Sequence, residues 1–191
     1  MVMPSRAASD SGVLVRPIVT IDPGHGGRQP GAVGPTGLLE KDVCLTVALR
    51  VRSLLQEQFD VRLTRDIDID VPLARRRAIA GSRAYISIHC NAFGDAAANG
   101  TETFWRSGGT AHDQRLAQVV QAEMLRALGR RDRGVKTAAF QVLRQGSVPA
   151  VLAELAFISN PVEEALLRGP QTHERAAQAI ASAIRVFISP L

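Results

Sequence analysis

Hydrophobic and polar residues follow two patterns along the chain, and the two patterns alternate. Residues 17–21 and 84–88 are short apolar runs rich in β-branched side chains, and each stops at a polar segment, so we predict that both are buried strands. Between them, residues 41–59 carry apolar side chains at helical spacing, which predicts an amphipathic helix. Further strands are expected at residues 61–64, 100–105 and 148–157, and further helices over residues 72–80 and 110–129, after Asn160 and after Gly169.

The alternation of strands and helices predicts a single α/β domain with a largely parallel sheet. The length of 191 residues suits one domain, and the sequence contains no internal repeat and no interdomain linker. Residues 1–14 lack the apolar core of a secretory signal, so we expect a disordered leader before a domain over residues 15–191. Residues 24–37 form a long glycine-rich loop, and such loops within compact domains are usually functional.

The overall composition is that of a globular protein, because 46% of the residues are hydrophobic and 21% are charged. No apolar stretch is long enough to span a membrane. The two cysteines, Cys44 and Cys90, are too few for a disulfide scaffold and lack the spacing of a thiolate zinc cluster. A formal net charge of +5 favours anionic partners such as nucleic acid, lipid headgroups or acidic cell-wall polymers, without choosing among them.

Four polar side chains stand where predicted strands meet loops or helices. His25 follows the first strand and Glu40 lies at the entry to the first helix. His89 follows the strand at residues 84–88, and Glu154 lies within the last strand. Because ligands bind beyond the carboxyl ends of strands in open α/β sheets, we expect both histidines at one edge. Two imidazoles and a carboxylate make a three-ligand zinc set that leaves a fourth position for water. A single histidine after a glycine-rich loop is more often a hydrogen-bonded loop residue, but two histidines at strand ends make the two interpretations nearly equal.

The most specific of these candidates is Glu154, which places a carboxylate inside an otherwise apolar strand. Burying an unpaired charge there is costly unless something compensates for it. A water molecule bound to a neighbouring metal ion would do so. A salt bridge to one of the many arginines, or an exposed position on an edge strand, would also account for the residue.

Five short blocks stand near the predicted strand ends, and in their order they resemble one known family. The blocks are Thr20-Ile-Asp-Pro-Gly-His-Gly-Gly27, Glu40-Lys-Asp42, Leu63-Thr-Arg65, Ser87-Ile-His-Cys-Asn-Ala92 and Pro149-Ala-Val-Leu-Ala-Glu-Leu-Ala-Phe-Ile-Ser-Asn160. Together they resemble the zinc-dependent N-acetylmuramoyl-L-alanine amidases, the catalytic domain that bacterial cell-wall hydrolases share. The resemblance extends from about Arg16 to the C-terminus, and five blocks are far more specific than any one of them.

The resemblance implies a three-layer α/β/α sandwich around a mixed, largely parallel sheet. It implies that His25, Glu40 and His89 bind Zn2+ and that Glu154 is the catalytic glutamate. The implied substrate is peptidoglycan, cut at the amide between the lactyl group of N-acetylmuramic acid and the L-alanine of the stem peptide. Cys90 departs from the small apolar residue common at its position, and if the strand continues through it, its side chain points away from the metal.

Four further polar residues lie near the expected site without a catalytic assignment. Arg65 and Arg76 fall at positions typical of the family, and structural ion pairs are favoured over substrate contacts for both. Asn91 and Glu102 lie near the same edge of the predicted sheet.

Several other functions stay open. A non-catalytic wall-binding module would not need three metal ligands and a buried acid. A nucleic-acid binder would suit the positive charge, but only 4% of the residues are aromatic and no nucleic-acid-binding motif is present, so no nucleic-acid partner is expected. A zinc peptidase acting on stem peptides is the nearest alternative enzyme. A peptidoglycan substrate places the expected action in the cell envelope, the periplasm or cell wall, and we expect a monomer.

Overall fold

The computed structural model describes residues 15–189, and the leader expected over residues 1–14 lies outside the described residues. The strands are β1 (Ile18–Pro23), β2 (Asp60–Leu63), β3 (Ser82–Asn91), β4 (Thr101–Arg106), β5 (Asp132–Ala138) and β6 (Ala150–Phe157). The helices are α1 (Glu40–Leu55), α2 (Ala111–Leu128), α3 (Pro161–Leu167) and α4 (Pro170–Ile188). Two short 3-10 turns, Leu73–Arg75 and Gln141–Leu143, lie in the connections.

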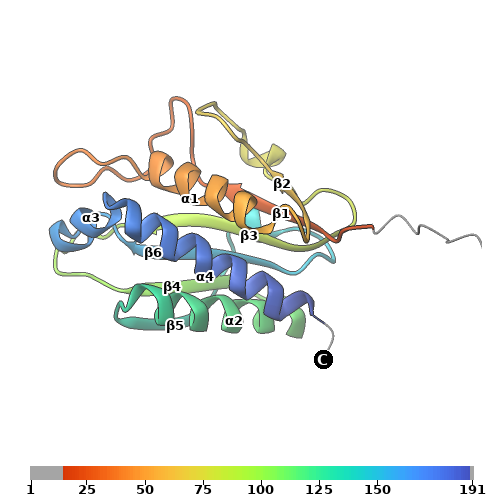
Figure 1. The fold of residues 1–191 in the computed structure, drawn as a ribbon. Helices are drawn as coiled ribbons and strands as arrows, with labels where there is room; N and C mark the ends of the chain where they lie inside the picture. The colour runs from red at the N-terminus through yellow and green to blue at the C-terminus, as the bar shows by residue number, and fades with distance from the viewer. Residues whose placement is uncertain (1–14, 190–191) are drawn as a thin grey trace, which may run out of the picture.

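The strands form one sheet in the order β2-β1-β3-β6-β4-β5 (Figure 1). β1, β2, β3 and β6 run parallel, β4 pairs with β6 in the antiparallel direction, and β5 runs parallel to β4. The predicted α/β domain with a mixed, largely parallel sheet is confirmed. Because β4 and β5 run in reverse, their amino ends lie at the edge where the four parallel strands have their carboxyl ends.

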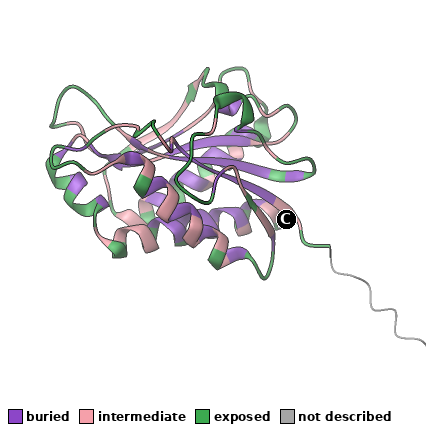
Figure 2. Cartoon of the chain, turned by 90° about the horizontal axis from the view of Figure 1, so that it is seen from above, coloured by how far each residue is buried: buried purple, intermediate pink, exposed green. Residues whose placement is uncertain are grey.

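The long helices pack on one face of the sheet. α1, α2 and α4 share one core with alternate positions of the central strands, including the fully buried Ile21, Ile86 and Val151. At about 1.5–3 kcal/mol for each fully buried large apolar side chain, this core is the main source of stability. Connecting segments with the two 3-10 turns cover the other face over a smaller core that includes Tyr85 and Leu152 (Figure 2). The sandwich therefore has helices in one outer layer and connecting segments in the other.

Local sequence signals set the ends of the helices as predicted. Thr110 caps α2 in a reciprocal arrangement with Asp113, and Gly129 ends that helix in a left-handed conformation at φ 61°. Asn160 caps α3 by accepting two backbone amide hydrogen bonds. None of the described helices has both the length and the apolar character needed to cross a membrane.

The helix predicted over residues 72–80 does not form, and only the 3-10 turn at Leu73–Arg75 is present. Amides that a longer helix would use bond to distant side chains instead. The amide of Ala78 donates to the side chain of Gln145, and the amide of Ile79 donates to a threonine hydroxyl on β1. Tertiary hydrogen bonds therefore override the local helical pattern in this segment.

Candidate active site

The two histidines and the first glutamate lie together at one edge of the sheet. His25 lies in the loop after β1, Glu40 begins α1, and His89 lies near the end of β3. One potential ligand atom of each residue lies within 4.8 Å of those of the other two. Glu40 Oε2 is 3.1 Å from His25 Nε2, and Glu40 Oε1 is 2.8 Å from His89 Nδ1. His25 follows β1 and His89 lies within the last residues of β3, so both stand at the carboxyl ends of neighbouring parallel strands, which explains why they meet.

The carboxylate of Glu40 is held by the backbone on both sides. Oε2 accepts a hydrogen bond from the amide of Ala32 at 2.8 Å, and Oε1 accepts one from the amide of Cys90 at 3.1 Å. Burial alone would raise the pKa of Glu40, but hydrogen bonds and charges from His25 and His89 lower it far below its ordinary value. Glu40 is therefore ionised at neutral pH, as a metal ligand must be. The Cys90 side chain itself lies in the main core, on the face of β3 opposite His89, as predicted.

The loop after β1 approaches His89 closely, and a glycine permits this approach. A Cβ atom added to Gly24 would lie 2.4 Å from a carbon of the His89 ring. The next residue, His25, has a positive φ of 58°, which is costly for a residue other than glycine. Backbone strain of this kind is typical of functional sites and persists only where the surrounding structure enforces it.

Two buried arginines enforce the conformation of this loop. Arg65 donates to the carbonyl of Gly24 at 2.8 Å. Arg76 pairs with Asp22 at 2.9 Å and donates to the carbonyl of His25. Burial alone would raise the pKa of Asp22, but the charge of Arg76 and two hydroxyl donors hold it below its ordinary value. Both arginines are structural, as predicted, although Arg65 acts through backbone carbonyls rather than through an ion pair.

The three side chains could hold a metal ion, and their chemistry suits zinc. Zinc binds imidazole nitrogens and carboxylate oxygens at about 2.0–2.2 Å, so ligand atoms around one tetrahedral ion lie about 3.3 Å apart. The distances from the Glu40 oxygens to the histidine nitrogens, 3.1 and 2.8 Å, are close to that separation. All three residues line one cavity, so a fourth coordination position would be accessible to water or substrate.

The second candidate carboxylate, Glu154, lies opposite His89 in the ladder between β3 and β6 and lines the same cavity. Within residues 15–189, Glu154 Oε2 is the one buried side-chain nitrogen or oxygen without a hydrogen-bond partner. Because β6 is a central strand and this oxygen has no donor, neither an edge position nor an arginine bound to it explains the residue. Burial, together with the charges of Glu40 and Glu102, raises the pKa of Glu154 well above its ordinary value.

A further carboxylate, Glu102, lies beside Glu154 and, unlike Glu154, is paired with cations. The two residues are paired across the antiparallel strands β4 and β6. Glu102 Oε2 lies 3.0 Å from Arg133 Nε and also contacts Lys136 Nζ, while Asn91 donates to its other oxygen. The sequence analysis placed Glu102 and Asn91 near this edge but predicted no strand over residues 132–138, because β5, which carries both cations, is a partly exposed edge strand interrupted by a glycine.

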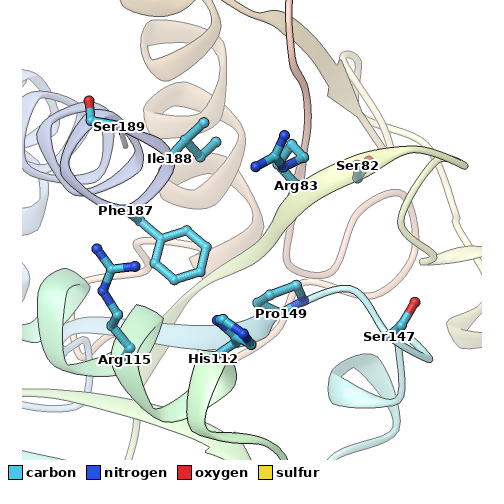
Figure 3. A pocket seen from close by; sticks show the side chains of 9 residues that line it. All are labelled: Ser82, Arg83, His112, Arg115, Ser147, Pro149, Phe187, Ile188 and Ser189. Atoms are coloured by element: carbon cyan, nitrogen blue, oxygen red, sulfur yellow. The ribbon is translucent and has the colours of Figure 1, made fainter. Parts of the chain in front are cut away.

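A cavity of about 460 Å³ joins the candidate residues. Beside the polar groups it has an apolar wall formed by Leu73, Phe140 and Leu152. A second cavity of about 470 Å³ lies at the amino ends of β3 and β6, lined by Arg83 and Arg115 among others (Figure 3). None of the predicted site residues lines this second cavity, so the candidate chemistry belongs to the first.

The fold and the site together define an α/β domain with an open candidate metal centre and an adjacent unpartnered carboxylate, the arrangement of a metal-dependent hydrolase. The sequence matches the family model described as N-acetylmuramoyl-L-alanine amidase over residues 19–186. The chain therefore belongs to the N-acetylmuramoyl-L-alanine amidase family and forms its catalytic domain.

Individual relatives agree with this assignment. The chain is 40% identical over 172 residues to N-acetylmuramoyl-L-alanine amidase LytC of Bacillus subtilis (strain 168). The matched region covers 87% of this chain but only 34% of LytC. It is 39% identical over 171 residues to the uncharacterized protein YqiI of the same strain, covering 87% of this chain and 82% of YqiI. The catalytic domain of CwlV, N-acetylmuramoyl-L-alanine amidase from Bacillus (Paenibacillus) polymyxa var. colistinus, has a TM-score of 0.85 at 36% identity, covering 90% of this chain and 98% of that one.

Proposed function

We propose that this domain is a zinc-dependent hydrolase that cleaves the amide between the lactyl group of N-acetylmuramic acid and L-alanine in peptidoglycan. The observation that carries the proposal is the position of Glu154, which lines the same cavity as His25, Glu40 and His89 and has a buried oxygen without a partner among residues 15–189. A buried carboxylate without a partner is costly, and such groups concentrate at functional sites. Membership of the amidase family supports the choice of bond and substrate.

His25, Glu40 and His89 would hold the zinc ion as a three-ligand set. Imidazole nitrogens favour zinc over magnesium and calcium, which prefer oxygen ligands. When bound, zinc supplies a Lewis acid that polarises the scissile carbonyl and makes a neighbouring water more acidic. The backbone amides on Glu40 fix the orientation of this ligand, as outer hydrogen bonds do at metal sites.

Glu154 acts first as a general base and then as a general acid. Its raised pKa gives the carboxylate a high affinity for a proton, so it removes one from the attacking water. It then delivers this proton to the nitrogen of L-alanine as the amide bond breaks, which yields a lactyl carboxylate and a free amine. Glu154 lines the cavity, and its Oε2 has no partner among residues 15–189, so no hydrogen bond to that oxygen has to break when the carboxyl group turns to the water and then to the amine.

The proposed substrate also fixes where the domain would act. Peptidoglycan lies outside the cytoplasmic membrane, so we propose that the domain acts in the periplasm or cell wall. It would act as a monomer, because the three candidate metal ligands all come from one chain. No nucleic-acid partner is proposed, because the sequence carries no nucleic-acid-binding motif.

Digestion of purified sacculi tests this proposal. We expect the zinc-loaded domain to release stem peptides with a free L-alanine amine, a chelator to abolish the release, and added zinc to restore it. Mass spectra that show cleavage between two amino acids of the stem would identify a zinc peptidase instead. Binding to sacculi without release of amines would identify a wall-binding module.

A further inference from the structure

Two cations converge on one carboxylate beside the candidate active site. Arg133 Nε lies 3.0 Å from Glu102 Oε2, and Lys136 Nζ contacts the same oxygen. We call Arg133 and Lys136 the cationic pair. Glu102 has only 5% of its side chain exposed, whereas Arg133 has 28% and Lys136 has 41%. Two positive charges therefore share one buried negative charge, and the excess positive charge faces solvent.

The cationic pair is linked to the cavity that holds Glu154 through Glu102 and Asn91. Glu102 is the partner of Glu154 across the β4–β6 ladder, and directly opposed residues have Cβ atoms about 4.5–5.5 Å apart. Asn91, which donates to Glu102, also lines the cavity. Arg133 and Lys136 lie on β5, so the excess charge is separated from Glu154 by one strand, β4, which carries Glu102.

Aromatic rings keep the cationic pair in place. The guanidinium carbon of Arg133 lies 4.7 Å from the centre of the Phe157 ring, and Lys136 Nζ lies 5.9 Å from that of Phe104. Phe104 in turn packs edge-to-face against Phe140, which lines the cavity, with ring centres 5.3 Å apart. Both cations are therefore held in place even without an anionic ligand, and Lys136 is linked to the cavity wall through Phe104 and Phe140. Such an arrangement lowers the entropic cost of binding an anion.

We propose that the cationic pair binds a carboxylate of the substrate peptide just beyond L-alanine, so that the domain prefers acidic stem peptides. This inference rests on the proposed function, because it assigns a subsite to the leaving peptide. Lys136 is the specificity-determining residue, since it is the more exposed of the two cations and Arg133 alone can keep Glu102 paired. Glu154 needs no cation to transfer a proton, and among residues 15–189 no cation pairs with it.

Two synthetic substrates test the inference. One is N-acetylmuramoyl-L-alanyl-D-isoglutamyl-L-lysine, and the other carries D-isoglutamine instead, which replaces one carboxylate with a carboxamide. We expect the zinc-loaded wild type to cleave the carboxylate compound with a KM about fivefold lower, the size of one partly exposed charged contact. In Lys136→Gln this preference should disappear through KM, with kcat unchanged. Lys136→Arg should retain it.

The matched control is Arg126→Gln, which removes the same charge from an exposed position on α2 paired only with Glu123. It should keep the wild-type preference. Equal KM values of the wild type for the two compounds would overturn the inference alone. So would a loss of kcat on both compounds in Lys136→Gln with the preference intact, because that result assigns Lys136 to the support of Glu154. Failure of the wild type to cut either compound at the lactyl amide would overturn the proposed function, and the inference with it.

Discussion

Glu102 and Glu154 occupy paired positions on neighbouring strands, yet among the described residues 15–189 only Glu102 has cationic partners. Arg133 and Lys136 reach the same Glu102 oxygen, while Glu154 Oε2 is buried without a hydrogen-bond donor. Burial without a partner favours the protonated form of a carboxylate, and the pKa of Glu154 is raised above its ordinary value. Glu102 instead pairs with Arg133 and Lys136 on the neighbouring strand, so the two residues are suited to different tasks.

Replacing Glu154 with glutamine should remove activity and leave the metal centre intact. An amide cannot take a proton from water, so we expect amine release from sacculi to fall by at least about 10²–10⁴-fold. Zinc content, measured on the same preparation, should match that of the wild type. The variant His89→Ala is the comparison, since it should lose zinc together with activity. Near-normal turnover in Glu154→Gln would remove the residue from the mechanism.

The same substitution should stabilise the metal-free domain at neutral pH. The folded state raises the pKa of Glu154 above its ordinary value of 4.5, so the penalty of ionising it is absent below that pH and grows as the pH rises. We expect Glu154→Gln to increase the free energy of unfolding by about 1 kcal/mol at pH 7.5, with a smaller gain near pH 4.5. Urea unfolding of chelator-treated protein at the two pH values measures this. The exposed Glu57→Gln should show no such gain, and a Glu154→Gln effect independent of pH would contradict the account.

Adding one methyl group at Gly24 should weaken zinc binding. The new Cβ would lie 2.4 Å from the His89 ring, so the ring must move away from its position beside Glu40. Misplacing a ligand in this way should lower zinc affinity by about 10–100-fold, the range found when the groups that orient ligands are lost. Competition with a chromophoric chelator measures the affinity. The control is Gly94→Ala, where a Cβ meets nothing within 4 Å, and an equal effect of both substitutions would refute the steric explanation.

The buried pair of Asp22 and Arg76 should make the fold sensitive to acid. The pKa of Asp22 in the folded state is below its ordinary value of 3.8. The ionised carboxylate therefore stabilises the fold above pH 3.8, and this stabilisation is lost as the pH falls through the pKa that Asp22 has in the folded state. We expect Asp22→Asn to cost about 3 kcal/mol at pH 7, because Arg76 loses its charged partner. The difference from wild type should shrink in strong acid, where the wild-type carboxyl is also protonated.

Urea unfolding at pH 7 and at pH 3 measures this difference. The control is Asp66→Asn, which removes an exposed carboxylate that lies 3.4 Å from Arg52, and its effect should be small at both pH values. A cost of Asp22→Asn that stays constant between the two pH values would show that the ion pair is not its source.

Much of the fold is predictable because its signals are local. The cap at Thr110, the left-handed Gly129 and the cap at Asn160 all stand where the sequence places helix ends. The helix predicted over residues 72–80 is wrong because its signal was weak and its amides found partners far along the chain, such as Gln145. Local propensity determines an element only where no stronger tertiary contact competes for the backbone.

The sequence by itself determined the metal-binding candidates and the unusual carboxylate. His25 and His89 stand at the carboxyl ends of two parallel strands, and these ends share one edge of the sheet. Glu154 lies within an apolar run, and a carboxylate there needs compensation wherever the run is buried. Only the tertiary structure decided that Glu102 lies beside Glu154 and takes the nearby cations. The reason is physical: the direction in which β4 pairs with β6 depends on long-range contacts, and no residue within β4 records it.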